Sequence, residues 1–69
     1  MKKMERFREM TDDELRAEET ELRRALFNLR LKKAVGQLEK PHQLKETKRD
    51  LARVLGLLKE RQRAAERRG

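Results

Sequence analysis

The sequence predicts an all-α fold, an antiparallel hairpin of two long helices, about 12–35 and 41–67, with a short N-terminal helix packed at its open end. Two ladders of leucines at seven-residue intervals predict this hairpin, and they flank a helix-breaking segment that runs from Gly36 to Pro41. If the two helices pair antiparallel, three pairs of leucines face each other in one register, and we call each pair a rung. The expected rungs are Leu29 with Leu44, Leu22 with Leu51, and Leu15 with Leu58.

The first two elements have recognisable start and stop signals. Residues 1–9 place apolar side chains at spacing three, which favours a short amphipathic helix. Thr11 is the expected N-cap of the first long helix, with Glu14 as its capping-box partner, while Met10 and Leu15 are spaced for a hydrophobic staple. Gly36 suits the left-handed residue that ends this helix.

The second long helix is expected to begin at Pro41. Proline lacks a backbone N–H, and the first turn of a helix does not use that group in an intrahelical hydrogen bond. The helix should lose order after Ala64, because no bulky apolar residue anchors its last turn. Its apolar stripe is expected to consist of Leu44, Thr47, Leu51, Val54, Leu55, Leu58 and Ala65.

Composition limits the chain to one domain, residues 1–69, with an anionic partner. Of its 69 residues 48% are charged, the net charge is +7 and the pI is about 10.4. Such a charge favours nucleic acid or an anionic membrane surface. A narrow apolar face, already used by the opposite helix, argues against the membrane. No apolar run approaches the roughly 20 residues of a membrane span, and no signal-peptide core follows the start, so we expect a cytoplasmic protein.

The charge is unevenly distributed along the expected hairpin. Residues 9–21 contain seven acids and one base, and this acidic start should neutralise the bases opposite it, which are Lys59, Arg61, Arg63, Arg67 and Arg68. The half near the turn should remain cationic and bind RNA, although a merely solvated basic face is the alternative. The candidate RNA-binding residues are Arg23, Arg30, Lys32, Lys33, Lys45, Lys48, Arg49, Ala52, Arg53 and Gly56.

A second candidate surface lies on the first long helix, opposite its leucine ladder. Phe27, Leu31 and Val35 cannot all enter the seam between the helices. Either the turn folds back so that Leu38 covers part of this patch, or the patch contacts RNA or a neighbouring protein.

Catalysis is not expected. The chain has one histidine, His42, no cysteine, and no paired carboxylates in a recognisable pocket, so we expect no metal site, no cofactor and no small-molecule substrate. Two phenylalanines are too few for a base-stacking platform, which favours recognition of RNA shape and phosphate.

Three segments together resemble the large-subunit ribosomal protein family numbered twenty-nine, of bacterial type. They are Leu26-Phe27-Asn28-Leu29-Arg30, Gly36-Gln37-Leu38-Glu39 and Lys48-Arg49-Asp50-Leu51-Ala52-Arg53. The resemblance implies a structural protein of translation that binds 23S-type ribosomal RNA near the polypeptide exit tunnel, through Lys48, Arg49, Ala52 and Arg53.

The same resemblance implies particular partners. It places the chain in the cytoplasmic large subunit, beside the family-twenty-three protein and near the docking site of nascent-chain factors such as trigger factor or signal recognition particle. Leu31 and Gly56 depart from the family pattern, which often has an aromatic residue and a threonine there. A free-standing basic coiled-coil hairpin that binds other proteins is the alternative function.

Overall fold

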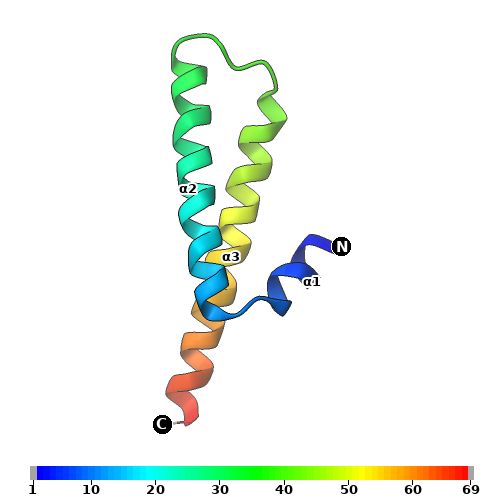
Figure 1. Cartoon of the computed structure of the whole chain (residues 1–69), viewed down its shortest axis with the longest axis vertical. Coiled ribbons are helices and arrows are strands. Elements are labelled where there is room, and N and C mark those ends of the chain that lie inside the picture. The colour runs from blue at the N-terminus through cyan, green and yellow to red at the C-terminus, as the bar shows by residue number, and fades with distance from the viewer. Residues whose placement is uncertain (1, 69) are drawn as a thin grey trace.

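The computed structural model describes residues 2–68 as three helices, of which two form an antiparallel hairpin. Helix α1 spans Lys2–Glu9, α2 spans Asp12–Ala34 and α3 spans Pro41–Arg68. Figure 1 shows α2 and α3 running side by side up to the turn, with α1 against the flank of α3. The molecule is an elongated rod of 49 × 22 × 15 Å. The predicted all-α hairpin with a short N-terminal helix is therefore confirmed.

Both ends of α2 have the predicted caps. The backbone N–H of Glu14 donates to Thr11 Oγ1 at 3.1 Å, and the Thr11 N–H donates to Glu14 Oε1 at 3.0 Å. At the other end Gly36 adopts φ +72°. The N–H groups of Gly36 and Gln37 donate to carbonyls of the last turn at 3.1 and 2.7 Å, which forms a Schellman motif.

The core consists of two leucine-rich clusters that follow one another along the hairpin, and each predicted rung lies within one cluster. The cluster nearer the open end buries Phe7, Leu15, Val54 and Leu57, and it packs against Met4, Met10, Leu22 and Leu58. The cluster nearer the turn buries Leu26, Leu44 and Leu51, and it packs against Leu22 and Leu29.

The predicted apolar stripe needs correction at several positions. Leu26 and Leu57 lie outside the seven-residue ladders, yet they are only 7% and 3% exposed. Leu55 is 36% exposed and Ala65 is also exposed, although both were expected in the seam. Phe7 of α1 explains part of the difference, because it joins the cluster around Leu57 and so extends the buried side of α3 away from Leu55.

Polar contacts hold α1 against α3 at both ends of the short helix. Lys3 Nζ lies 3.2 Å from Asp50 Oδ2, and Arg61 Nη2 donates to the carbonyl oxygen of Arg8 at 3.0 Å. Arg61 also reaches α2, where its Nη1 lies 2.8 Å from Asp12 Oδ1. Arg61 therefore ties all three helices together. Helix α3 continues to Arg68, close to the predicted end at about residue 67.

Candidate nucleic-acid interface

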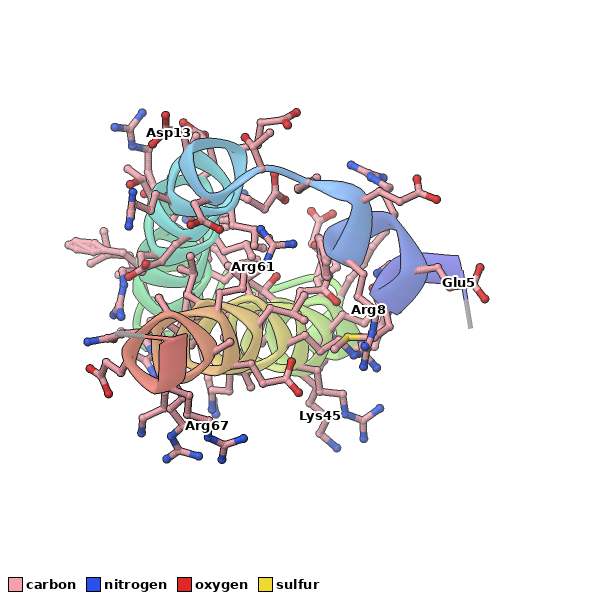
Figure 2. All side chains as sticks on the ribbon, turned by 90° about the horizontal axis from the view of Figure 1, so that it is seen from below. Glu5, Arg8, Asp13, Lys45, Arg61 and Arg67 are labelled. Carbon is pink, nitrogen blue, oxygen red and sulfur yellow. The ribbon has the colours of Figure 1, made fainter. Side chains whose placement is uncertain are left out.

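The outer face of α3 carries a row of exposed basic and small residues that takes no part in the core. Successive members are three or four positions apart, so they fall within about 80° of arc, on the side opposite buried Val54. Figure 2 shows Lys45 and Arg67 projecting from the same side of α3, away from Asp13 on α2. We call this surface the α3 stripe; it consists of Lys45, Arg49, Ala52, Gly56, Lys59, Arg63 and Arg67.

The middle of the α3 stripe has little side-chain bulk. A Cβ added to Gly56 would meet nothing within 4 Å, and the backbone there has no positive φ. Neither internal packing nor backbone conformation therefore requires glycine at this position. Together with Ala52 it leaves the helix backbone open to close approach by a partner.

Three bases of the turn half are already paired within their own helices. Arg53 Nη1 lies 2.9 Å from Asp50 Oδ1, and Arg23 Nε lies 2.9 Å from Glu19 Oε2. Arg24 makes a longer contact with a glutamate three residues earlier, at 3.8 Å. Such pairs form because residues three or four apart share a helix face. The turn half was expected to remain cationic, and these pairs neutralise part of its charge.

The remaining predicted bases are exposed at three places in the hairpin. Lys45 and Arg49 belong to the α3 stripe, and neither forms an ion pair among the described residues. Lys48 is exposed on α3, and Lys32 and Lys33 are exposed in the last turn of α2. Arg30 lies beside the apolar residues of α2 instead.

The open-end bases are less neutralised than the sequence suggested. Arg61 pairs with Asp12, but Lys59, Arg63 and Arg67 are exposed and form no ion pair within the part of the chain that the structure describes. The Arg68 side chain lies outside that part. The acids of α2 face a different side of α3, so proximity along the hairpin does not bring the charges together. The three-and-four spacing that continues from Lys45 was the signal that could have revealed this.

The apolar residues on the outer side of α2 lie beside an open groove. Phe27, Leu31 and Val35 are 53%, 52% and 66% exposed. The groove beside them is lined by Arg23, Leu26, Phe27, Arg30, Leu31 and Leu51. Leu38 does not line it and lies in the hollow at the turn, next to Leu29 and Gln43. The alternative in which Leu38 covers this patch was therefore wrong.

Other kinds of site find little support in the structure. Residues 2–68 contain no cluster of three or more histidine, cysteine or acidic residues suited to a metal ion. None of the three helices has a stretch long and apolar enough to cross a membrane. His42 is exposed in the first turn of α3.

Comparison with known proteins identifies the family. Residues 5–61 match the family model described as "Ribosomal L29 protein". The chain belongs to the ribosomal L29 family. Large ribosomal subunit protein uL29 of Persephonella marina is 55% identical over 60 residues, which cover 87% of this chain and 88% of that protein. The uL29 protein of Zymomonas mobilis is 43% identical over 65 residues, covering 94% and 97%. No solved structure matches the chain significantly.

Proposed function

We infer that this L29-family chain is a single-domain, non-enzymatic structural constituent of the large ribosomal subunit in the cytoplasm. Membership of the family and the names of its relatives support this role in translation over that of a free-standing interaction module. We further propose that it binds large-subunit ribosomal RNA near the exit tunnel. The observation that carries this proposal is the α3 stripe, an exposed surface with bases and no acid.

The chemistry of the stripe fits phosphate better than base edges. Guanidinium and ammonium groups release counterions from a polyanion when they bind its phosphates, whatever the sequence. The stripe contains no aromatic side chain on which a base could stack. Lys45 and Arg49 lie at one end of the surface formed by Ala52 and Gly56, where small side chains let the phosphate backbone of an RNA approach α3 closely. Lys48 lies beside the same surface and adds charge.

A salt titration tests the RNA-binding proposal. The double variant Lys45→Gln/Arg49→Gln removes two charges, while glutamine keeps a similar helix propensity. We expect the slope of log affinity for 23S-type RNA against log salt to become shallower by about 1.8, at roughly 0.9 per lost phosphate contact.

The matched control is Arg16→Gln/Arg24→Gln, which removes the same charge from exposed positions of α2. The slope for this control should change little, because Arg16 and Arg24 lie off the α3 stripe and each pairs with an acid of α2. If the salt slope changed equally in the two double variants, net charge alone would explain the binding. That result would contradict the proposal.

We propose that the groove beside Phe27 packs against a neighbouring ribosomal protein. Apolar side chains gain most from a partner that removes them from water, which a protein surface does better than a phosphate backbone. Arg23 and Arg30 line the same groove and favour an acidic rim on that neighbour. The family-twenty-three protein is the expected neighbour, and trigger factor or signal recognition particle would use the surface that remains exposed.

A photo-crosslinking residue at position 27, incorporated into assembled large subunits, tests this contact. We expect a crosslinked product with one neighbouring ribosomal protein. The same residue at position 24, on the same helix and exposed, is the control and should give a different pattern. Crosslinks from position 27 to RNA alone would contradict a protein neighbour.

A further inference from the structure

We propose that Lys59, Arg63 and Arg67 form a second RNA-binding cluster, so that α3 bridges two backbone segments of the ribosomal RNA. This inference rests on the proposed function, because it assigns a further contact to the same partner. The sequence alone had indicated that these bases are neutralised by α2. Their exposure and their spacing along the α3 stripe indicate the opposite, and Figure 2 shows this position for Arg67.

Arg63 and Arg67 lie beyond Arg61 on α3, and Lys59 lies about one turn before Arg63. Asp12, the first residue of α2, pairs with Arg61. Residues 62–67 follow this last cross-helix ion pair, and all of them are exposed. Gln62 and Ala65 still line a hollow with residues of α2, but Arg63 and Arg67 lie on the stripe and are open to an RNA.

The charge around this cluster also favours an anionic partner. The nearby acids of α3 are Glu60 and Glu66, and each lies about 60° around the helix from the midline of the α3 stripe. Neither forms an ion pair among the side chains that the structure describes, those of residues 3–67. The acids at the start of α2 face another side, as Figure 2 shows for Asp13 relative to Arg67. No carboxylate therefore occupies the stripe itself.

The spacing of the bases indicates two contacts instead of one continuous contact. Lys45 and Arg49 form one cluster, and the middle of the second cluster lies about 24 Å further along α3 at 1.5 Å per residue. Uncharged Ala52 and Gly56 lie between them. An RNA backbone winds around its own axis, so a straight protein helix meets backbone segments at separated points. Two basic clusters separated by a surface of small, uncharged side chains suit contact with two separate segments of an RNA backbone.

Binding measurements with full-length 23S-type RNA test the second contact. The variant Arg63→Gln/Arg67→Gln should make the salt slope shallower by about 1.8 and weaken binding about tenfold or more near 0.1 M salt. Neither side chain packs in the core, so the variant should fold, which circular dichroism can verify. Arg16→Gln/Arg24→Gln again serves as the control for an equal loss of charge.

The outcomes separate this inference from the proposed function. If Lys45→Gln/Arg49→Gln weakens binding while Arg63→Gln/Arg67→Gln behaves like the control, the second contact is refuted and the first remains. If neither double variant differs from the control, or if the unaltered protein does not prefer this RNA over bulk transfer RNA, the proposed function itself fails. Shallower slopes in both variants support the bridge.

Directed cleavage of the RNA can locate the two segments. The chain contains no cysteine, so Glu66→Cys or Glu46→Cys supplies a unique attachment point for a tethered iron chelate without removing a base. We expect hydroxyl radicals from position 66 to cut an RNA segment distinct from the one cut from position 46. Thr20→Cys, exposed on α2, is the control. Cuts from position 46 without cuts from position 66 would refute the bridge.

Discussion

Leu15 should be the residue of α2 whose truncation costs the most stability. Its side chain is 0% exposed and is buried with Phe7, Val54 and Leu57, so all three helices surround it. Leu15→Ala removes three buried carbons and leaves a cavity that the small core cannot fully close. Substitutions of this kind cost about 2–5 kcal/mol, and we expect roughly 3. At about 4–8 °C per kcal/mol for a domain of this size, the midpoint should fall by about 12–24 °C.

Thermal and urea unfolding followed by far-UV circular dichroism measure this effect. Leu31→Ala is the matched control, because it makes the same chemical change in the same helix at a site that is 52% exposed. Its free energy of unfolding should change by less than about 1 kcal/mol. Leu15→Met, which conserves volume, should recover most of the loss. Equal losses in Leu15→Ala and Leu31→Ala would refute the placement of the core at the junction of the three helices.

Three further substitutions test other parts of the structure. Gly56→Ala should stabilise α3 by about 1 kcal/mol, because an added Cβ meets nothing within 4 Å. The same substitution should weaken RNA binding. Stabilisation with unchanged affinity would show that no phosphate backbone approaches this position closely. Hydrogen bonds from the Thr11 backbone and side chain lower the pKa of Glu14 below 4.5, so its stabilising contribution is present above about pH 4.5 and is lost as the pH falls through the lowered pKa. Glu14→Gln should therefore flatten the acid side of a stability–pH profile, and an unchanged profile would contradict the capping box. Asp50→Asn should loosen α1 and speed its removal by limited proteolysis, because Asp50 pairs with Lys3; cleavage at the original rate would show that α1 is held by its apolar contacts alone.

Local signals predicted the helix boundaries well because each cap depends on a few adjacent residues. Thr11 with Glu14, Gly36, and Pro41 each mark an end through their own hydrogen-bonding or backbone geometry, and the structure places helix ends at these positions. The leucine ladders likewise predicted the pairing of α2 with α3, since seven-residue spacing keeps side chains on one face.

Burial was predicted less well because it depends on a third helix. A two-helix pattern favours Leu55 and Leu58 equally with Val54, but α1 brings Phe7 to one side of α3 and so buries Leu57 there. The position of α1 is set by long-range contacts such as that of Lys3 with Asp50, which no local spacing reveals.

To predict which bases are neutralised, one needs the position of each residue around its helix axis as well as its position along the hairpin. Arg67 lies near the acidic end of α2 in the antiparallel register, yet Figure 2 shows it on the side of α3 away from Asp13. Arg63 is four residues earlier on the same helix face and is exposed. Arg53 and Arg23 lie in the cationic half, yet they pair with acids three or four residues away. A helical projection of each helix, in place of a sum of charges by region, would have predicted both results.

Leu22 should make the unfolding of this protein cooperative. It packs against the cluster around Leu15 and also against the cluster around Leu26, so neither cluster can come apart without disturbing a side chain of the other. The two ends of the hairpin should consequently open in one transition, with similar hydrogen-exchange protection in the middle of α2 and the middle of α3. With so small a core, the chain should therefore meet the RNA in one of two states. It is either folded, with the bases of the α3 stripe aligned, or unfolded.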